Sequence, residues 1–325
     1  MPIAPNPANQ AAISDRPNPD EPHQTLDSAF YLAFEMTHRA LKEGLAQASD
    51  LSVTQYRMLV KLQATSPEPL SQTELGRILG LKANVVTQAI NGLEPKGLAV
   101  REINAEDSRS RLITITDAGV AHIDHVNEAL VSQLYALFPT EDTAYRSILE
   151  ASIAAGALID PPLSHDSVIR YPASRALVSL ELIRQATEQG LKEACGASYT
   201  ECRIMQRLGE LGKPQRIVDL SGQLDISAVN IARTADKLAA RGWIRRMRSS
   251  ADRKAVYLAL TPEGEFQCNI IDRKAEQLGN DLLWSRLSPD NRQAVADVGR
   301  VVISGIRAKR EARRSAALDS LEPID

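Results

Sequence analysis

Apolar residues recur at helical spacing through most of this 325-residue chain, and at two places the spacing shortens to the pattern of a β-strand. The clearest change lies between Ser71 and Thr116. Before Gly97, apolar side chains stand three and four residues apart, which predicts two short helices. After Gly97 they stand in short alternating runs, which predicts a β-hairpin. The segment therefore predicts a helix, a turn, a second helix and a hairpin, in that order.

The limits of this segment are marked by individual residues. Ser71 and Glu74 have the spacing of a capping box, in which each side chain hydrogen-bonds an otherwise unpaired backbone N–H of the first helical turn. Gly80 suits a left-handed turn and should end the first helix. The remaining elements are expected over 83–94 for the second helix and over 98–103 and 111–116 for the hairpin strands. This order of elements is that of a winged helix-turn-helix.

Amphipathic helices are predicted on both sides of this segment. Each carries an apolar stripe on one face and therefore needs a partner surface. Their expected ranges are 26–48, 54–63 with Thr54 as its N-terminal cap, 117–138, and 140–157 after Pro139. Pro161 and Pro162 then interrupt the helical pattern and indicate a linker.

The whole pattern occurs twice. Aligning Gly97 with Gly242 gives an offset of 145 residues, and the offset becomes 146 upstream, where Thr54 meets Thr200. Further matches at the first offset are Leu75 with Leu220, Asp107 with Asp252, Thr116 with Thr261 and Gly119 with Gly264. A repeat as long as a domain indicates a duplication rather than a solenoid, whose repeats are much shorter.

The duplication divides the chain into five expected parts. They are a disordered, proline-rich arm over 1–24, a first winged-helix domain over 25–158, a linker over 159–172, a second winged-helix domain over 173–308 and a tail over 309–325. The fold class is then mainly α, with small β-hairpin wings and long helices outside them. No run of residues is apolar for long enough to span a bilayer, and the first residues lack the pattern of a secretory signal. We therefore expect a cytoplasmic protein without membrane contact.

Net charge changes this picture only locally. The formal charge of −3 and the pI near 6.0 do not favour a nucleic-acid partner, so any DNA-binding surface must be a patch on an acidic body. Residues 82–111 hold five basic and four acidic side chains, whereas residues 227–254 hold eight basic and two acidic ones. The second unit should therefore supply more affinity for phosphate groups than the first.

The second short helix of each unit presents polar side chains on its outward face. Such side chains can pair with base edges in the major groove, and a basic hairpin tip can reach phosphates or the adjoining minor groove. A solvated helix face and a surface ion pair of little energetic value are the simpler alternatives. The candidate DNA-binding residues are Lys82, Asn84, Thr87, Gln88, Asn91, Arg109 and Arg111 in the first unit, and Ser227, Asn230, Arg233, Lys237, Arg253 and Lys254 in the second.

The chain resembles the MarR family of transcription regulators twice, in the segments LEPKGLAVREINAEDSRSRLITITDAG and LAARGWIRRMRSSADRKAVYLALTPEG. In that family such a segment forms the end of the recognition helix, the wing and the following turn. The wing pattern is Asp-x-Arg, and the first unit matches it with Asp107 and Arg109. The second unit has Asp252 and Lys254, and a lysine cannot make the bidentate contact of an arginine. The resemblance covers nearly all of the chain except the arm, the linker and the tail.

The resemblance implies a sequence-specific regulator that binds double-stranded DNA as a dimer and, in most members, represses transcription. Two fused copies can form that dimer within one chain as a pseudo-dimer, or the fused chain can dimerise again. Gln88 stands where the second copy has Arg233, so the half-sites should differ and the operator should be an imperfect palindrome. The alternative function is a protein-interaction scaffold in which the first, nearly neutral head has lost its DNA-binding surface.

Members of this family are often released from DNA by small aromatic or phenolic ligands bound between the dimer helices and the DNA-binding lobe. The resemblance therefore implies a small-molecule effector, for which the candidate ligand-binding residues are Phe30, Phe34, His38 and Tyr56. A helix that packs its apolar face against the other copy is the simpler explanation of the same residues.

Other groups of residues predict no further chemistry. His122 and His125 lie three residues apart without a third ligand, so no metal site is expected. Cys195, Cys202 and Cys268 lack metal-ligand spacing and have no cysteine counterparts in the first copy, which favours buried thiols, with a redox role for Cys202 as the alternative. No phosphate-binding loop, nucleophile elbow or carboxylate pair is found, so neither an enzyme nor a cofactor is expected.

Overall fold

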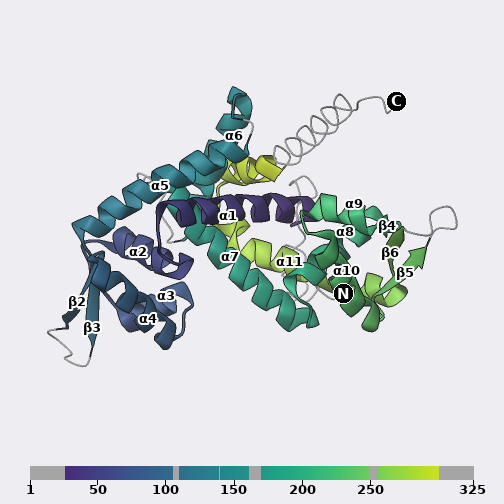
Figure 1. The fold of residues 1–325 in the computed structure, drawn as a ribbon, viewed down its shortest axis with the longest axis horizontal. Coiled ribbons are helices and arrows are strands. Elements are labelled where there is room, and N and C mark those ends of the chain that lie inside the picture. The colour runs from purple at the N-terminus through teal and green to yellow at the C-terminus, as the bar shows by residue number, and fades with distance from the viewer. Residues whose placement is uncertain (1–25, 105–109, 139, 161–169, 249–254, 300–325) are drawn as a thin grey trace, which may run out of the picture.

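The computed structural model describes residues 26–104, 110–138, 140–160, 170–248 and 255–299. Within these ranges the chain is mainly helical, with two small antiparallel sheets (Figure 1). The expected arm over 1–24, the tail over 309–325 and most of the linker lie outside the described residues. No helix within the described ranges is both long and apolar enough to cross a membrane.

The first unit contains the elements that the apolar pattern predicts, together with a two-residue strand before the first short helix that the pattern does not predict. They are α1 (Ser28–Ala48), α2 (Val53–Thr65), β1 (Leu70–Ser71), α3 (Gln72–Leu79), α4 (Ala83–Leu93), β2 (Ala99–Ile103), β3 (Arg111–Ile115), α5 (Asp117–Leu137) and α6 (Thr143–Ala157). The capping box at α3 is confirmed: the Ser71 hydroxyl accepts the Glu74 N–H at 3.2 Å, and the Glu74 carboxylate accepts the Ser71 N–H at 2.9 Å. Gly80 ends this helix at φ 64°, a left-handed conformation that favours glycine.

Three helix starts differ from the expectation. The first helix, expected from 26, begins at Ser28, because the Asp27 side chain accepts the Phe30 N–H and caps it. Thr54 does not cap α2, because Ser52 does: its hydroxyl accepts the Gln55 N–H at 3.3 Å, and the Gln55 side chain accepts the Ser52 N–H at 2.8 Å. The last helix of the unit begins at Thr143 rather than at 140, because the Asp142 carboxylate accepts N–H groups of its first turn.

The second unit repeats the elements α1 to α5 of the first in the same order. Its elements are α7 (Pro172–Cys195), α8 (Tyr199–Leu211), β4 (Gln215–Arg216), α9 (Ile217–Leu224), α10 (Ala228–Ala240), β5 (Ile244–Arg248), β6 (Val256–Leu260) and α11 (Pro262–Leu282). The sheet orders are β1-β3-β2 and β4-β6-β5. The register is also the same, since Arg101 pairs with Ile113 and Arg246 pairs with Leu258, each 145 residues further on.

The repeated Thr and Gly after each wing have a structural role. The hydroxyl of Thr116 donates to the Gly97 carbonyl at 2.6 Å and accepts the N–H of Gly119, so it ties the start of α5 to the start of the wing. A Cβ on Gly119 would lie 2.3 Å from the Leu98 carbonyl oxygen. Only glycine therefore allows this close approach of helix and wing.

The second copy builds the same junction. The hydroxyl of Thr261 donates to the Gly242 carbonyl at 2.6 Å, and a Cβ on Gly264 would lie 1.8 Å from the Trp243 carbonyl oxygen. These residues are the counterparts of the first junction at the offset of 145. The Thr-x-x-Gly repeat is thus explained by packing.

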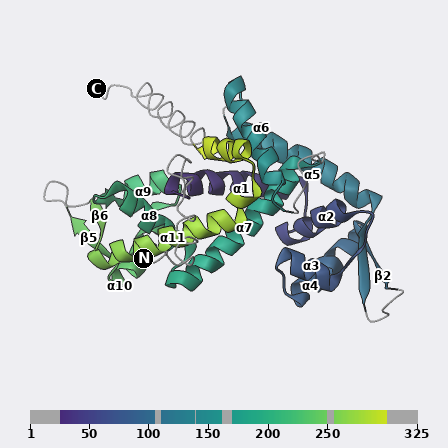
Figure 2. The ribbon, with the colours of Figure 1, turned by 180° about the vertical axis from the view of Figure 1, so that it is seen from behind.

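The hydrophobic cores of the two units each draw on both copies. One core combines most of the first unit with Leu177 and Val178 of α7, and the other combines most of the second unit with Tyr31 and Phe34 of α1. Figures 1 and 2 show α1 and α7 lying together in the middle of the molecule, with one winged-helix head at each end. The long helices therefore connect the heads through a shared interior.

Candidate nucleic-acid interface

The first recognition helix, α4, separates apolar and polar residues onto opposite faces. Val86, Ile90 and Leu93 are fully buried against the head. Five candidates named above are exposed along the other side, namely Lys82, Asn84, Thr87, Gln88 and Asn91. The Thr87 hydroxyl donates to the Ala83 carbonyl at 3.0 Å, so it is partly engaged within the helix.

The second recognition helix, α10, is exposed in the same way but carries charge. Asn230, Arg233 and Lys237 are exposed, and the neighbouring Val229 is 68% exposed. The Ser227 hydroxyl accepts the Asn230 N–H at 3.3 Å and so caps the helix. An apolar side chain of this exposure beside charged residues can contact a thymine methyl group.

An arginine from each wing is bound to the recognition helix of the same head. Arg101 on β2 donates to the Asn91 side-chain oxygen at 2.8 Å and pairs with Glu94 at 2.9 Å. Its counterpart Arg246 on β5 donates to the Ala232 carbonyl at 2.8 Å and pairs with Asp236 at 2.8 Å. These contacts fix the wing against the helix, so the two elements can meet DNA as one surface. They also engage the Asn91 amide oxygen.

The heads differ in how many of their exposed cations form ion pairs with described residues. In the first head, Lys96 is paired with Asp50, in addition to the pair made by Arg101. In the second head, four exposed cations of α10 and β5 form no ion pair with a described residue, namely Arg233, Lys237, Arg245 and Arg248. Unpaired cations are the groups that release counterions when a protein binds DNA, so a greater phosphate affinity of the second head stays the prediction that its exposed charge favours.

The wing tips fall partly outside the described residues. Arg109 in the first wing, and Arg253 and Lys254 in the second, lie outside them. Arg111 begins β3 and is exposed.

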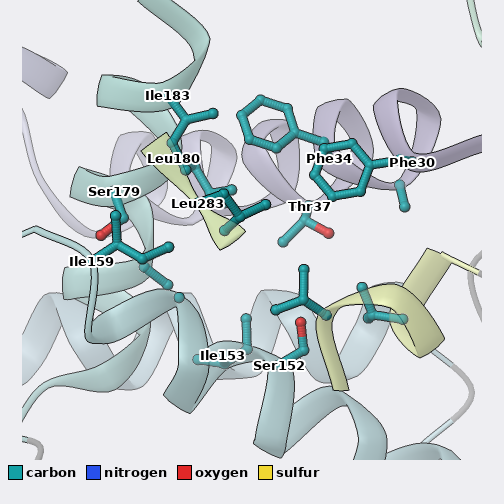
Figure 3. A pocket seen from close by; sticks show the side chains of 15 residues that line it. Phe30, Phe34, Thr37, Ser152, Ile153, Ile159, Ser179, Leu180, Ile183 and Leu283 are labelled. Atoms are coloured by element: carbon teal, nitrogen blue, oxygen red, sulfur yellow. The ribbon is translucent and has the colours of Figure 1, made fainter. Parts of the chain in front are cut away.

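The four candidate ligand-binding residues do not form one site. Phe30 and Phe34 line a cavity between the copies (Figure 3). Tyr56 is fully buried elsewhere and shares a 2.7 Å hydrogen bond with Ser174, and burial raises the pKa of its phenol. His38 stacks beside Phe34 but faces α7 instead of the cavity. Tyr56 and His38 therefore serve packing between the copies.

Two side-chain pairs join α1 to α7, and of their four members only His38 was a candidate from the sequence. His38 Nε2 lies 2.7 Å from Glu181 Oε2, and Arg184 Nε lies 3.4 Å from Glu35 Oε1. The hydrogen bond with His38 lowers the pKa of Glu181 to about 2. The internal repeat contained a signal for these pairs. Glu35 and Glu181 are equivalent positions of the two copies, 146 residues apart, and so are His38 and Arg184.

A buried polar cluster lies beside these pairs. Arg57 is 1% exposed, and its Nε and Nη2 atoms have no hydrogen-bond partner among the described residues. Lys61 Nζ lies 3.8 Å from Asp160 Oδ1, with both side chains buried. Burial lowers the pKa of Lys61 and raises that of Asp160. This cluster connects α2 of the first head to the region where the two copies meet.

The remaining histidine and cysteine candidates have local partners. His122 Nε2 lies 2.9 Å from the Ser49 hydroxyl, and burial lowers its pKa. No group of metal-ligating side chains is found in the part of the chain that the structure describes. Cys202 is fully buried, and its thiol lowers the pKa of the neighbouring Cys195 to about 6.

Comparison with known proteins agrees with the duplicated winged helix. Two family models, both described as the MarR family, match residues 49–110 and 197–256. The transcriptional repressor MprA of Escherichia coli (strain K12) is 36% identical over 87 residues, which cover 26% of this chain and 48% of MprA. The uncharacterized HTH-type transcriptional regulator YpoP of Bacillus subtilis (strain 168) is 34% identical over 68 residues, or 21% of this chain and 48% of YpoP. The matches thus span about half the length of these relatives.

The solved structures that resemble this chain include DNA complexes. Sco3205, a MarR family regulator from Streptomyces coelicolor in complex with DNA, is 18% identical with a TM-score of 0.37, covering 39% of this chain and 84% of its own. A mutant MarR from E. coli, complexed with operator DNA, is 19% identical with a TM-score of 0.31, covering 34% of this chain and 81% of its own.

Proposed function

Because this chain belongs to the MarR family and carries two of its winged-helix units in tandem, we propose that it is a sequence-specific regulator that binds double-stranded DNA with both heads of one chain. The observation that carries the proposal is the exposed polar face of each recognition helix, held against its wing by Arg101 in one head and Arg246 in the other. A helix of this kind fits the major groove, and the wing beside it reaches the backbone.

The two units are proposed to form one pseudo-dimer. In a two-fold dimer, if position i of one copy contacts position j of the other, then position j of the first copy also contacts position i of the second. The pairs His38 with Glu181 and Arg184 with Glu35 have this reciprocal relation. Covalent linkage raises the effective concentration of the second head to the millimolar range or so, which favours pairing within the chain at any protein concentration.

The operator is proposed to be an imperfect palindrome. Two-fold DNA readers place their half-sites about 10 base pairs apart, and each half-site is read by one recognition helix. Here Gln88 on α4 stands where α10 carries Arg233, and both side chains are exposed. A glutamine amide suits adenine and an arginine suits guanine, so the two half-sites should favour different bases.

We further propose that the protein represses transcription and is released by a small effector. The name of MprA describes a transcriptional repressor, and a repressor needs only to occupy its operator. The cavity lined by Phe30 and Phe34 lies between α1 and α7, so a ligand there would act on the helices that connect the heads.

Selection of bound fragments from genomic DNA by the purified chain tests this function. We expect enrichment of fragments that share one imperfect palindrome, and a loss of enrichment in the double variant Gln88→Ala, Arg233→Ala. Arg273→Ala, which removes an exposed cation from α11, is the matched control and should retain the same fragments. If no DNA is enriched at moderate salt, the scaffold alternative replaces this proposal.

A further inference from the structure

An ion pair joins the first long helix to the turn of the second helix-turn-helix. Arg39 on α1 donates to the Asp225 carboxylate at 2.8 Å, and Asp225 lies in the turn between α9 and α10. Figures 1 and 2 both show α1 reaching the second head beside α9. Two residues after Asp225, Ser227 caps the N-terminus of α10. The pair therefore connects a helix of the first copy to the start of the second copy's recognition helix.

The backbone at Asp225 is left-handed, at φ 52° and ψ 45°. Most side chains are strained in this conformation, and Asp225 is one of two non-glycine residues with positive φ in the part of the chain that the structure describes. Its counterpart in the first head is Gly80, at φ 64°, where an added Cβ would meet no atom within 4 Å. Glycine thus fits this turn without strain, and what the aspartate adds is a carboxylate that Arg39 can bind.

The first head has no equivalent ion pair among the described residues. The counterparts of the pair are Gln185, at the offset of 146, and Gly80, at the offset of 145. The Gln185 amide donates to Glu181 at 2.7 Å and accepts from Arg57 at 3.3 Å, so it is bound to α7 and α2. The turn of the first helix-turn-helix is therefore not joined to the other copy by this pair of positions.

Elsewhere each long helix is attached to the head of the other copy. The Ser28 N–H, at the start of α1, donates to the Glu210 carboxylate of the second head at 2.7 Å. The counterpart Ser174 N–H, near the start of α7, donates to the Asn127 side chain of the first unit at 3.1 Å. Attachment at the helix starts thus occurs in both copies, and the copies differ at the turn that leads into the recognition helix.

The pair is exposed, with 52% of the Arg39 side chain and 39% of the Asp225 side chain accessible to solvent. Exposed ion pairs contribute little to stability, so this one can favour one arrangement of the head without holding the fold together. We propose that Arg39 and Asp225 are positioning residues for DNA binding. They hold the second recognition helix in a set position relative to the central helices, whereas the first recognition helix adjusts to the distance between the half-sites.

Pulsed electron paramagnetic resonance on the full chain measures the arrangement of each head without DNA. A ketone-bearing amino acid carries the spin labels, so the three cysteines stay unlabelled. One pair of labels replaces the exposed residues Glu43 on α1 and Arg233 on α10, and the equivalent pair replaces Gln189 on α7 and Gln88 on α4. We expect a narrower distance distribution for the second head than for the first. Equal widths would overturn the proposal.

Two variants remove the ion pair with opposite effects on charge. Arg39→Gln removes a cation, and Asp225→Gly removes an anion at a turn that glycine fits, so both variants should fold. We expect each to broaden the distribution of the second head to about the width of the first and to leave the first unchanged. Lys42→Gln removes another exposed cation of α1 and is the matched control. The same broadening in Lys42→Gln, or none in the two variants, contradicts a role of this pair.

Operators of altered spacing test the consequence for DNA, which rests on the proposed function. One base pair inserted between the half-sites separates them by about 3.4 Å more and rotates one by about a tenth of a turn. The preference for the selected operator over the lengthened one should fall by about two- to fivefold in both Arg39→Gln and Asp225→Gly, the change in population that an exposed pair can produce. Arg39→Lys, which keeps the charge, should retain most of the preference.

The opposite charge changes separate positioning from simple attraction to phosphate. Charge alone moves the affinities in opposite directions, because Arg39→Gln weakens the attraction to DNA and Asp225→Gly strengthens it. Positioning moves the spacing preference in the same direction in both variants. An unchanged preference in both variants, or changes of opposite sign, would overturn the positioning role.

The two measurements also separate this inference from the proposed function. If the chain enriches no genomic fragment, DNA binding is refuted, while unequal label distributions still show the pair holding the second head. If the chain binds its operator but the two heads have equal distributions, this inference alone fails.

Discussion

His38 Nε2 on α1 lies 2.7 Å from Glu181 Oε2 on α7, although 143 residues separate them in sequence. Both side chains are nearly buried, at 5% and 13% exposure. Such a pair cannot form unless the first helix of each copy lies against the other. The reciprocal pair of Arg184 and Glu35 at the matching positions makes the contact a property of the duplicated unit.

The pairing predicts a specific loss of stability in acid. The pKa of Glu181 is about 2 in the folded chain, below its ordinary value of 4.5, so the ionised carboxylate stabilises the fold above pH 5 or so. This stabilisation declines as the pH falls from the ordinary pKa toward the folded one. Relative to Glu181→Gln, we expect the free energy of unfolding of the unmodified chain to fall by on the order of 1–2 kcal/mol between pH 6 and pH 3.

Urea unfolding at a series of pH values measures this difference. Glu193→Gln, at an exposed position of the same helix, is the control and should follow the unmodified chain. If the unfolding free energies of the chain and of Glu181→Gln run parallel at every pH, the pair contributes no pH-dependent stability.

The glycines after the wings predict a second effect on stability. Gly119→Ala and Gly264→Ala each place a Cβ against a backbone carbonyl, at 2.3 and 1.8 Å, and a backbone atom cannot move aside as a side chain can. We expect the free energy of unfolding of each variant to fall by more than about 2 kcal/mol, because substitutions that force atoms into a well-packed interior have costs of this order. Thermal unfolding measures the loss, with Gly156→Ala as a glycine substitution that the structure accommodates. If the melting temperatures of both variants lie within about a degree of that of Gly156→Ala, the helix and the wing are packed less closely than these distances imply.

The exposed cations of the second head that form no ion pair with a described residue predict the salt dependence of DNA binding. If Arg245 and Arg248 contact phosphates, each replacement by alanine should lower the slope of log affinity against log salt by about 0.9. Lys96→Ala in the first head should change it less, because Lys96 is already paired with Asp50. Fluorescence anisotropy with the selected operator at several salt concentrations provides the slopes. Equal reductions from all three variants would mean that the heads share the phosphate contacts evenly.

The difference between the recognition helices predicts an asymmetric footprint. Gln88→Ala should weaken protection at one half-site and Arg233→Ala at the other, with a discrimination loss of about 1–3 kcal/mol for each lost base contact. Footprinting of the operator with each variant identifies the half-site that each head reads. A symmetric site that responds equally to both variants contradicts the assignment of unlike half-sites.

Local patterns predicted most of the fold. Ser71, Glu74 and Gly80 act through neighbours within a few residues, so their roles can be inferred from spacing alone. The cap of α2 was assigned to Thr54 instead of Ser52, because either residue type can cap and only the observed hydrogen bonds distinguish them.

Local patterns could not predict contacts between residues that are far apart in the sequence. The role of Glu181 depends on a partner in the other copy, and the contact of Arg101 with Asn91 depends on how the wing folds back on its helix. Phe30 and Phe34 line a cavity, whereas Tyr56 and His38 do not, and only the packing separates the two pairs. Ligand binding by Phe30 and Phe34 stays a prediction. The internal offset was the one long-range signal in the sequence.

The number of chains on one operator tests the central claim most directly. Sedimentation of the purified 35.5 kDa chain with the selected operator, at protein concentrations on either side of the dissociation constant, measures this ratio. We predict one chain for each operator at every concentration, because both heads belong to one pseudo-dimer. Two chains for each operator, with binding that depends on chain association, would contradict the account.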